Sequence, residues 1–346
     1  MKNVRLELVS GFAGSLVNKV VIGLITFYGG YQVIKGRMTL GSLTAIMMYI
    51  GQLIGLQYSF ARFFQNIALG LVSCQRVDEI LDKRTKIVEA KQAKAVVFRR
   101  GQIQFRNVSF GYKQREPILS GINFDIGGGL HIALVGSSGC GKTTILNLIL
   151  RLYEVWSGEI RIDGHNIKDL RFSSLRGQIG IALQEPFLWN DTIENNIRYA
   201  REDAGTREIT EIAQLTGVDD FVKDLPGGYN TIIGENACKI SEGQKQKIAI
   251  ARALIKEPKI LILDEAMSSM DPQSEEKIIK NIKDNFKDIT LIIISHRLST
   301  VMSAELVYFL TKEGNIIVDT AQNFLQRDRD FSRLFSHQGE LSLFSE

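Results

Sequence analysis

The order of hydrophobic and polar positions divides the sequence into two parts of different character. Two long apolar stretches come first, at about residues 9–33 and 40–56, with a short polar turn between them. A membrane-spanning helix needs about 20 mostly apolar residues, and each stretch is close to that length. The pattern therefore predicts an all-α hairpin of two membrane helices. A buried hairpin of a soluble domain is the alternative, because Asn18 and Lys19 would be costly against lipid.

The pattern changes after the second stretch. Charged positions become frequent from Arg76 onward, as in a helix that leaves a membrane and continues into the cytosol. Strand-like apolar runs then begin at residues 102–105 and recur at 118–126. We therefore predict two domains: a partial transmembrane domain at 1–95 and an α/β domain at 96–346.

The charge distribution supports this division. No acidic residue lies between Glu7 and Asp78. Residues 1–95 hold 12 basic and 5 acidic side chains, and the rest of the chain holds 30 basic and 33 acidic ones. The basic cluster between Arg76 and Lys94 places the end of the second helix on the cytoplasmic side.

Composition excludes several classes of protein. The 346 residues are 45% hydrophobic and 23% charged, which rules out intrinsic disorder and a polytopic membrane protein along the whole length. The net charge of only +4 gives no support for a nucleic-acid partner. Cys74, Cys140 and Cys238 form no C-x-x-C pair, so neither a disulfide scaffold nor a zinc knuckle is expected.

The strongest local signal is a glycine-rich loop between an apolar run and a helix-like segment. Residues 136–143 fit the pattern G-x-x-x-x-G-K-[ST] in the strand–loop–helix context that it requires. Such a loop wraps phosphate groups with its backbone amides, which predicts a nucleoside triphosphate site. Lys142 can reach the β- and γ-phosphates, and the Thr143 hydroxyl can ligate Mg²⁺. The residues predicted to bind the nucleotide here are Gly136, Ser137, Ser138, Gly139, Cys140, Gly141, Lys142, Thr143 and Thr144.

A second candidate site follows a continuous apolar run at residues 259–263. The run suits a buried strand of a parallel sheet, and it ends in Asp264 and Glu265. These carboxylates then lie at the carboxyl end of the strand, where open α/β sheets bind ligands. Asp264 is placed to hold Mg²⁺, and Glu265 to orient or deprotonate an attacking water.

The residues between these two motifs resemble the signature of ATP-binding cassette (ABC) proteins. The family pattern L-S-G-G-Q reads here Ile240-Ser241-Glu242-Gly243-Gln244. Residues 231–237 are similar to the T-x-x-G-E-x-G segment of exporter-type cassettes. Other positions resemble family features in family order: Tyr112 the aromatic residue that stacks on adenine, Gln184 the glutamine loop, Asp271 the aspartate loop and His296 the switch histidine.

This resemblance implies a P-loop NTPase cassette with a RecA-like lobe and a helical lobe at about residues 186–254. It implies hydrolysis of ATP with Mg²⁺, in which Glu265 is the general base, His296 steadies the γ-phosphate and Lys142 acts at the phosphates. Gln184 is implied as a metal ligand beside Thr143 and Asp264, and as the link to the membrane helices. The residues implied to bind the ATP of a second, head-to-tail cassette are Ser241, Gly243, Gln244 and Asp271.

The resemblance further implies an exporter-type half-transporter, multi-pass in the plasma membrane with its cassette in the cytoplasm. Exporters of this type usually carry six membrane helices, so the remaining helices are expected from a longer chain or a partner. Glu242 replaces a signature glycine and either repels a partner's γ-phosphate or points away from it. Three alternatives stay open: a truncated remnant that does not transport, a non-catalytic cassette, and a soluble cassette ATPase of DNA repair or translation.

Overall fold

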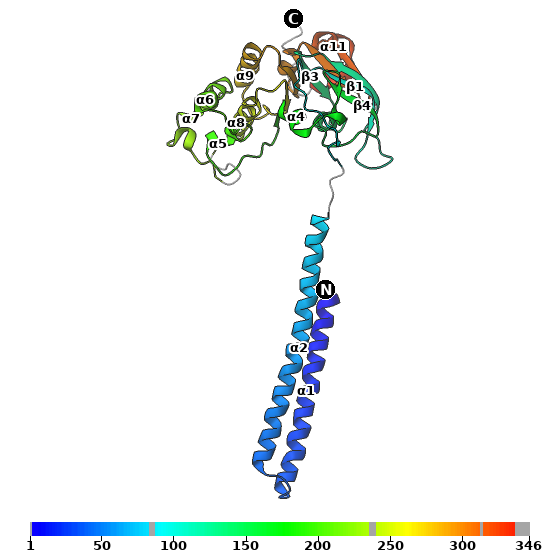
Figure 1. Ribbon diagram of the computed structural model, residues 1–346, viewed down its shortest axis with the longest axis vertical. Helices are drawn as coiled ribbons and strands as arrows, with labels where there is room; N and C mark the ends of the chain where they lie inside the picture. Colours follow the sequence, from blue (N-terminus) through cyan, green and yellow to red (C-terminus); the bar gives the residue numbers. More distant parts are fainter. Residues whose placement is uncertain (1, 83–86, 235–239, 312–313, 336–346) are drawn as a thin grey trace. The chain divides into compact units, whose positions relative to one another are not determined.

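The computed structural model describes residues 2–82, 87–234, 240–311 and 314–335. Two compact units divide the chain, Met1–Lys86 and Ile87–Glu346. The first is a helical hairpin and the second a mixed α/β cassette (Figure 1). The domain boundary after residue 95 stays a prediction. The second unit begins earlier, at Ile87, and within it the Lys94 amide donates to the Asp169 carbonyl at 2.8 Å.

The hairpin consists of α1 (Lys2–Ile34) and α2 (Leu40–Leu81). The short turn between them ends at Thr39, whose hydroxyl accepts a hydrogen bond from the Ser42 amide at 3.2 Å and so caps α2. The predicted helical stretches are confirmed as helices. The second helix extends well past residue 56, as expected of a helix that continues beyond an apolar segment.

The two helices pack closely near the turn. A Cβ atom at Gly29 would lie 2.3 Å from Cδ1 of Leu43, so the absence of a side chain permits this approach. Farther from the turn, the Asn18 side-chain amide donates to the Tyr58 hydroxyl at 3.1 Å. One of the polar groups that would be costly against lipid therefore has a partner inside the hairpin.

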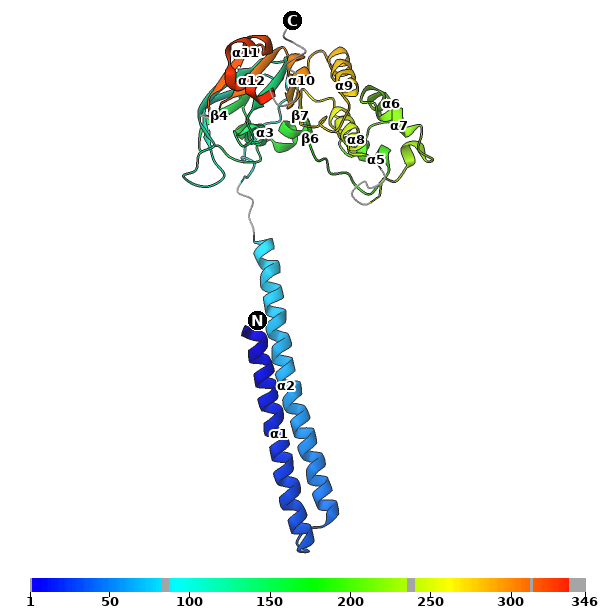
Figure 2. The ribbon, with the colours of Figure 1, turned by 180° about the vertical axis from the view of Figure 1, so that it is seen from behind.

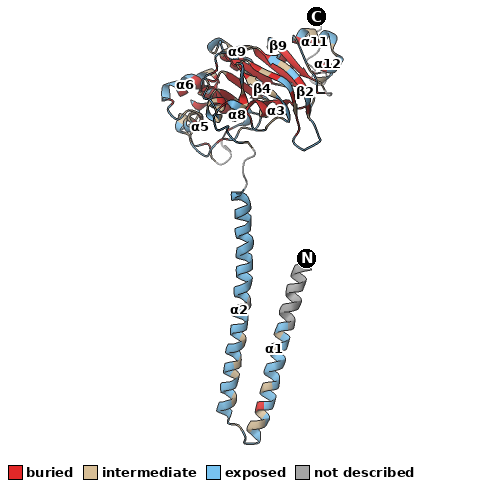
Figure 3. Cartoon of the chain, turned by 45° about the vertical axis from the view of Figure 1, so that its right-hand side comes forward, coloured by how far each residue is buried: buried red, intermediate tan, exposed pale blue. Residues whose placement is uncertain are grey.

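The hairpin leaves most of its apolar side chains exposed (Figure 3). Phe27 is 81% exposed, Ile34 87% and Met48 71%. Among the described residues, α2 is the one helix long and apolar enough to cross a membrane. The prediction of two membrane-spanning helices is therefore met by α2 by length and composition, whereas α1 does not meet this criterion over its described residues.

Two sheets build the cassette. The larger has six strands in the order β10-β9-β3-β8-β7-β6, parallel except for β10. The smaller is antiparallel, in the order β2-β1-β4-β5. The strands of the larger sheet are β3 (His131–Gly136), β6 (Ile179–Leu183), β7 (Ile260–Asp264), β8 (Thr290–Ile294), β9 (Leu306–Leu310) and β10 (Ile316–Asp319), and those of the smaller are β1 (Ile103–Phe110), β2 (Leu119–Ile126), β4 (Ser157–Ile162) and β5 (His165–Asn166).

Helices cover the sheets, and α5 to α8 gather at one side of the cassette (Figures 1 and 2). These four lie within residues 186–254 and form the predicted helical lobe. The helices are α3 (Lys142–Ile149), α4 (Phe172–Gly177), α5 (Ile193–Arg198), α6 (Thr206–Leu215), α7 (Val218–Val222), α8 (Glu242–Leu254), α9 (Pro272–Asn285), α10 (Leu298–Met302), α11 (Ala321–Arg327) and α12 (Arg329–Phe335), with 3₁₀ turns η1 (Ile167–Asp169) and η2 (Gly228–Asn230).

Strand β7, next to the edge strand β6, is buried on both faces. Leu261 and Leu263 belong to the apolar cluster that includes the helical lobe. Ile260 and Ile262 belong to the cluster that includes α3 and the antiparallel sheet. This explains the continuous apolar run in the sequence, and it brings the acidic end of β7 out at the carboxyl edge of the sheet.

Candidate functional site

The predicted phosphate loop joins β3 to α3, and its shape requires glycine. A Cβ atom at Gly136 would lie 2.7 Å from both the Leu310 carbonyl oxygen and Cys140 Sγ. Gly141, the N-cap of α3, has φ 111°, a value that side chains rarely adopt. The loop thus leads directly into the N-terminus of α3, where the first backbone amides have no partner within the helix and suit an anion.

Lys142 is buried and its ammonium group is held by the loop itself. Its Nζ atom donates to the Gly136 carbonyl at 2.7 Å and to the Ser137 carbonyl at 3.1 Å. The loop thus curls around a positive charge. A charge held in this way is ready for phosphate oxygens at little cost in side-chain entropy.

The two carboxylates at the end of β7 differ in their surroundings. Burial raises the pKa of Asp264, the neighbouring Glu265 carboxylate raises it further, and Lys142 lowers it. Glu265 adopts φ 51°, in the left-handed region that a side chain rarely occupies, and its amide donates to the Ile294 carbonyl at 3.0 Å. Glu265 Oε1 lies 2.8 Å from Nε2 of His296, which is hydrogen-bonding distance.

A cavity of about 350 Å³ brings these groups together. It joins the phosphate loop, the carboxylates, the histidine and Tyr112, whose hydroxyl lies 3.3 Å from Thr144 Oγ1 and whose half-exposed ring packs edge-on against Phe110. The predicted site residues that line it are Tyr112, Ser138, Gly139, Gly141, Lys142, Thr143, Thr144, Asp264, Glu265 and His296. Gly136, Ser137 and Cys140 lie in the same loop without lining the cavity.

The oxygen donors in this cavity fit Mg²⁺. The exposed Thr143 side chain and the Asp264 carboxylate line the same space, and Mg²⁺ prefers such hard oxygen ligands. Burial, and after it the neighbouring Glu265 carboxylate, raise the pKa of Asp264, and a bound cation would offset both effects by favouring the charged carboxylate. Gln184, the third implied ligand, belongs to the described part of the chain but does not line this cavity.

The signature residues begin α8 and hold one another in place. The Ser241 hydroxyl accepts from the Gln244 amide at 3.3 Å, and Gln244 Oε1 accepts from the Ser241 amide at 2.9 Å. This reciprocal pair is a capping box. Glu242 occupies the first helical position, 60% exposed, and its carboxylate lies 2.6 Å from Lys245 Nζ. The extra carboxylate therefore has a positive partner within its own chain.

Gln184 lies beside the signature helix in a separate cavity of about 470 Å³. That cavity is lined by Gln184, Glu185, Pro186, Phe187, Glu242, Lys245, Ser268 and Ser269. Asp271 caps α9 through the Ser274 amide at 2.8 Å. None of Ser241, Gly243, Gln244 and Asp271, all within the described part of the chain, lines the phosphate cavity.

Sequence reasoning missed two groups of residues around the site. Exposed aromatic rings follow Gln184: Phe187 packs edge-on against Trp189, with ring centroids 4.8 Å apart, and Trp189 packs against Tyr199. Their spacing of two and ten residues carries no recognisable local pattern. The other group is polar and links loops across the cassette, and its members are Gln246, Glu275 and Arg297.

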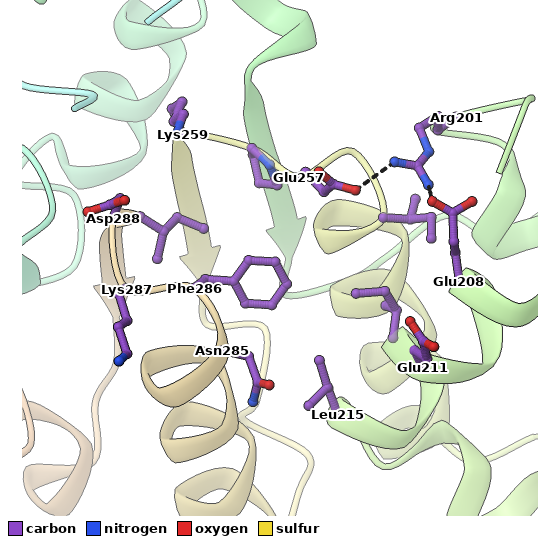
Figure 4. Close-up of a pocket in the computed structure, with 14 residues that line it drawn as sticks. Arg201, Glu208, Glu211, Leu215, Glu257, Lys259, Asn285, Phe286, Lys287 and Asp288 are labelled. Atoms are coloured by element: carbon purple, nitrogen blue, oxygen red, sulfur yellow. Dashed lines mark hydrogen bonds and ion pairs between the residues drawn. The ribbon is translucent and has the colours of Figure 1, made fainter. Parts of the chain in front are cut away.

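A larger cavity, of about 560 Å³, lies elsewhere in the cassette (Figure 4). The Phe286 ring points into it, and Arg201 forms ion pairs with Glu208 and with Glu257 at its rim. Its lining contains no predicted site residue among those that the structure describes. The larger volume of this cavity therefore does not make it the candidate reactive site. The smaller phosphate cavity is the candidate because Lys142, Asp264 and Glu265 converge on it.

Residues 235–237 of the exporter-like segment lie outside the described residues. Thr231, at its start, is described, and its carbonyl accepts from the Ile193 amide at 3.2 Å at the beginning of α5. The similarity of this segment to the corresponding segment of exporter-type cassettes therefore rests on its sequence alone.

Comparisons with known proteins agree with this geometry. Residues 119–268 match the family model described as ABC transporter. The ATP-dependent lipid A-core flippase of Syntrophus aciditrophicus (strain SB) is 39% identical over 98% of this chain, and the chain covers 56% of that protein. The ATM1-type heavy metal exporter of Novosphingobium aromaticivorans is 35% identical over 93% of this chain and is covered to 53%.

A solved structure of a bacterial Atm1-family ABC exporter with ATP bound is similar over 95% of this chain, with a TM-score of 0.74 and 33% identity. This chain covers 58% of that one, so it spans about half the length of the relatives it matches. The similarity extends over nearly all of this chain and so includes the hairpin as well as the cassette. Residues 119–268 of the cassette thus match the ABC transporter family, and the chain is similar to exporters of that family over nearly its whole length.

Proposed function

We propose that this chain binds ATP and hydrolyses it with Mg²⁺, and that hydrolysis drives export of a solute across the plasma membrane. The observation that supports this most directly is the single cavity that joins Lys142, Asp264, Glu265 and His296. A phosphate loop alone suits nucleotide binding. A carboxylate and a histidine in direct contact beside it suit hydrolysis.

In this proposal the residues divide the work. Lys142 binds the β- and γ-phosphates, and the ring of Tyr112 stacks on the base. Glu265 takes a proton from the attacking water, while His296 holds its carboxylate in position through the 2.8 Å contact and steadies the γ-phosphate. Thr143 and Asp264 line one cavity and would hold Mg²⁺ there, which would neutralise charge on the phosphates. Gln184 lies in the separate cavity beside α8, so it would join them as a ligand only if its segment moves toward the phosphate loop.

We further propose that two cassettes pair head to tail. The residues Ser241, Gly243, Gln244 and Asp271 lie outside the phosphate cavity of their own chain, which leaves them available to another chain's nucleotide. The second cassette comes from an identical or a related chain.

The hairpin supports a membrane location. Its apolar side chains are exposed, and exposed surfaces of this kind need lipid or other helices. Further membrane helices come from a longer chain or a partner, and the cassette lies in the cytoplasm. The relatives' names mention lipid A-core and heavy metals, which differ in chemistry, so we assign no cargo.

The test is Mg²⁺-dependent ATP hydrolysis by the purified full chain in detergent. Glu265→Gln should reduce turnover about a hundredfold or more while ATP binding is kept, because it removes the base and not the phosphate loop. Glu276→Gln is the matched control, since this exposed carboxylate on α9 does not line the phosphate cavity. Equal rates in the wild type and Glu265→Gln would contradict the proposed role of Glu265.

A further inference from the structure

Gln246 is a buried polar residue for which the proposed mechanism has no role. It lies in α8, two positions after the last signature residue, and is 1% exposed. A buried side-chain amide is stable only when its donors and acceptor are satisfied. Its partners therefore show what it is fixed to.

Both ends of the Gln246 amide bond to segments far away in the sequence. Nε2 donates to the Gln184 carbonyl at 3.2 Å and to Ser268 Oγ at 3.2 Å, with Ser269 Oγ at 3.4 Å. Oε1 accepts from the Ser269 amide at 3.1 Å. One side chain thus joins the signature helix, the segment that carries Gln184 and the loop that leads to Asp271.

The same loop is held from a second direction. Arg297, the residue after His296, donates through Nη2 to the carbonyls of Ser268 at 3.1 Å and Met270 at 2.8 Å. Its Nη1 donates at 2.5 Å to Glu275, a carboxylate that is 4% exposed. The loop before Asp271 is therefore clamped between two polar side chains, and Gln246 is the one that connects it to α8.

We propose that Gln246 is a positioning residue for ATP hydrolysis. It fixes the signature helix, the Gln184 segment and the aspartate loop relative to one another, so that all three meet a pair of nucleotides in one arrangement. This inference rests on the proposed ATP hydrolysis by paired cassettes. It predicts an effect on turnover rather than on nucleotide binding, since Gln246 and its partners lie outside the lining of the phosphate cavity.

The variants separate positioning from general packing. Gln246→Met keeps the length of the side chain and removes its hydrogen bonds. Gln246→Asn keeps the amide but is one methylene shorter, so it cannot reach all three segments. The control is Gln178→Met: the Gln178 amide also bonds to three groups, the Phe98 amide and the Val96 and Ser174 carbonyls, at the opposite end of β6 from Gln184.

The measurements are kcat and KM for ATP and the melting temperature of the full chain in detergent. Gln246→Met and Gln246→Asn should lower kcat about tenfold or more and change KM for ATP less than about threefold. Gln178→Met should lower the melting temperature and keep kcat within about twofold of the wild type. If Gln246→Met does not fold, Gln246→Asn gives the measurement.

Two results would overturn the inference in distinguishable ways. An active wild type with unchanged kcat in the Gln246 variants, or with the same loss in the Gln178 control, would show that Gln246 serves stability alone. Absence of ATP hydrolysis by the wild type would instead contradict the proposed function, and the role of Gln246 with it.

Discussion

Replacing Glu242 by glycine tests how this chain accommodates an acid in the signature. Two stabilising contributions are lost, because Glu242 lies in the first turn of α8 and forms an ion pair with Lys245. A negative charge at a helix N-terminus contributes about 0.3–1 kcal/mol. An exposed pair at this spacing contributes about 0.2–0.5 kcal/mol, and screening reduces that value because the carboxylate is 60% exposed.

The expected loss is therefore about 1 kcal/mol, or about 2–4 °C in the melting temperature of a domain of this size. ATP-dependent pairing of cassettes should stay unchanged, since Lys245 already offsets the charge of Glu242. The assay compares melting temperature and ATP-induced pairing in the wild type, Glu242→Gly and Glu242→Gln. The glutamine variant removes the charge and keeps a side chain of similar length, which separates the loss of charge from the greater backbone freedom of glycine.

A different result would refute this reasoning. If Glu242 faces a partner's γ-phosphate, Glu242→Gly should pair more strongly and hydrolyse ATP faster. The gain should increase at low ionic strength, where charges interact over longer distances. Stronger pairing of that kind would mean that the ion pair with Lys245 does not neutralise the signature.

Three further predictions concern the nucleotide, the fold and the membrane. Lys142→Ala should weaken ATP binding about tenfold or more, and equal thermal stabilisation by ATP in both forms would contradict this role of Lys142. It should also lower the melting temperature without nucleotide, because the Gly136 and Ser137 carbonyls lose their charged donor. Asp163→Asn should lower the melting temperature at pH 7. Burial raises the pKa of Asp163, but hydrogen bonds from the amides of residues 99–102 lower it more, so the pKa is lower in the folded than in the unfolded protein. The stabilising contribution of Asp163 is therefore present above about pH 4 and is lost as pH falls through the folded-state pKa. The melting temperatures of the two forms should converge in acid, and a difference that stays constant with pH would contradict this prediction. The full chain should stay in the membrane pellet after a carbonate wash, and its release would favour a soluble cassette ATPase.

The site residues that can be predicted from the sequence are those that lie next to one another in the chain. The phosphate loop and the Asp264–Glu265 pair each lie within a few residues, and the buried strand before each sets where they emerge. Topology then brings them together, because β3, β8 and β7 are neighbours in one parallel sheet. These elements could be predicted from local pattern and the general geometry of α/β sheets.

The contacts that could not be predicted join residues far apart in the chain. Gln246 and Gln184 are 62 positions apart, and Arg297 and Ser268 are 29 apart. A polar residue in a helix gives no local sign of whether it faces solvent or a distant loop. The ion pair between Glu242 and Lys245 is different. Residues three positions apart are neighbours on a helix, so this pair could have been predicted from the sequence.

The capping box at the start of α8 also determines the hydrogen-bond character of the surface there. It occupies one of the two acceptor lone pairs of the Ser241 hydroxyl oxygen and one of the two on the Gln244 side-chain oxygen. The hydroxyl hydrogen and the two amide hydrogens that remain are all donors. A phosphate group can only accept from such a surface, whereas a ligand that itself donates finds fewer acceptors on these side chains. The local fold of this helix end therefore presents more donors than acceptors, which suits an acceptor-rich anion.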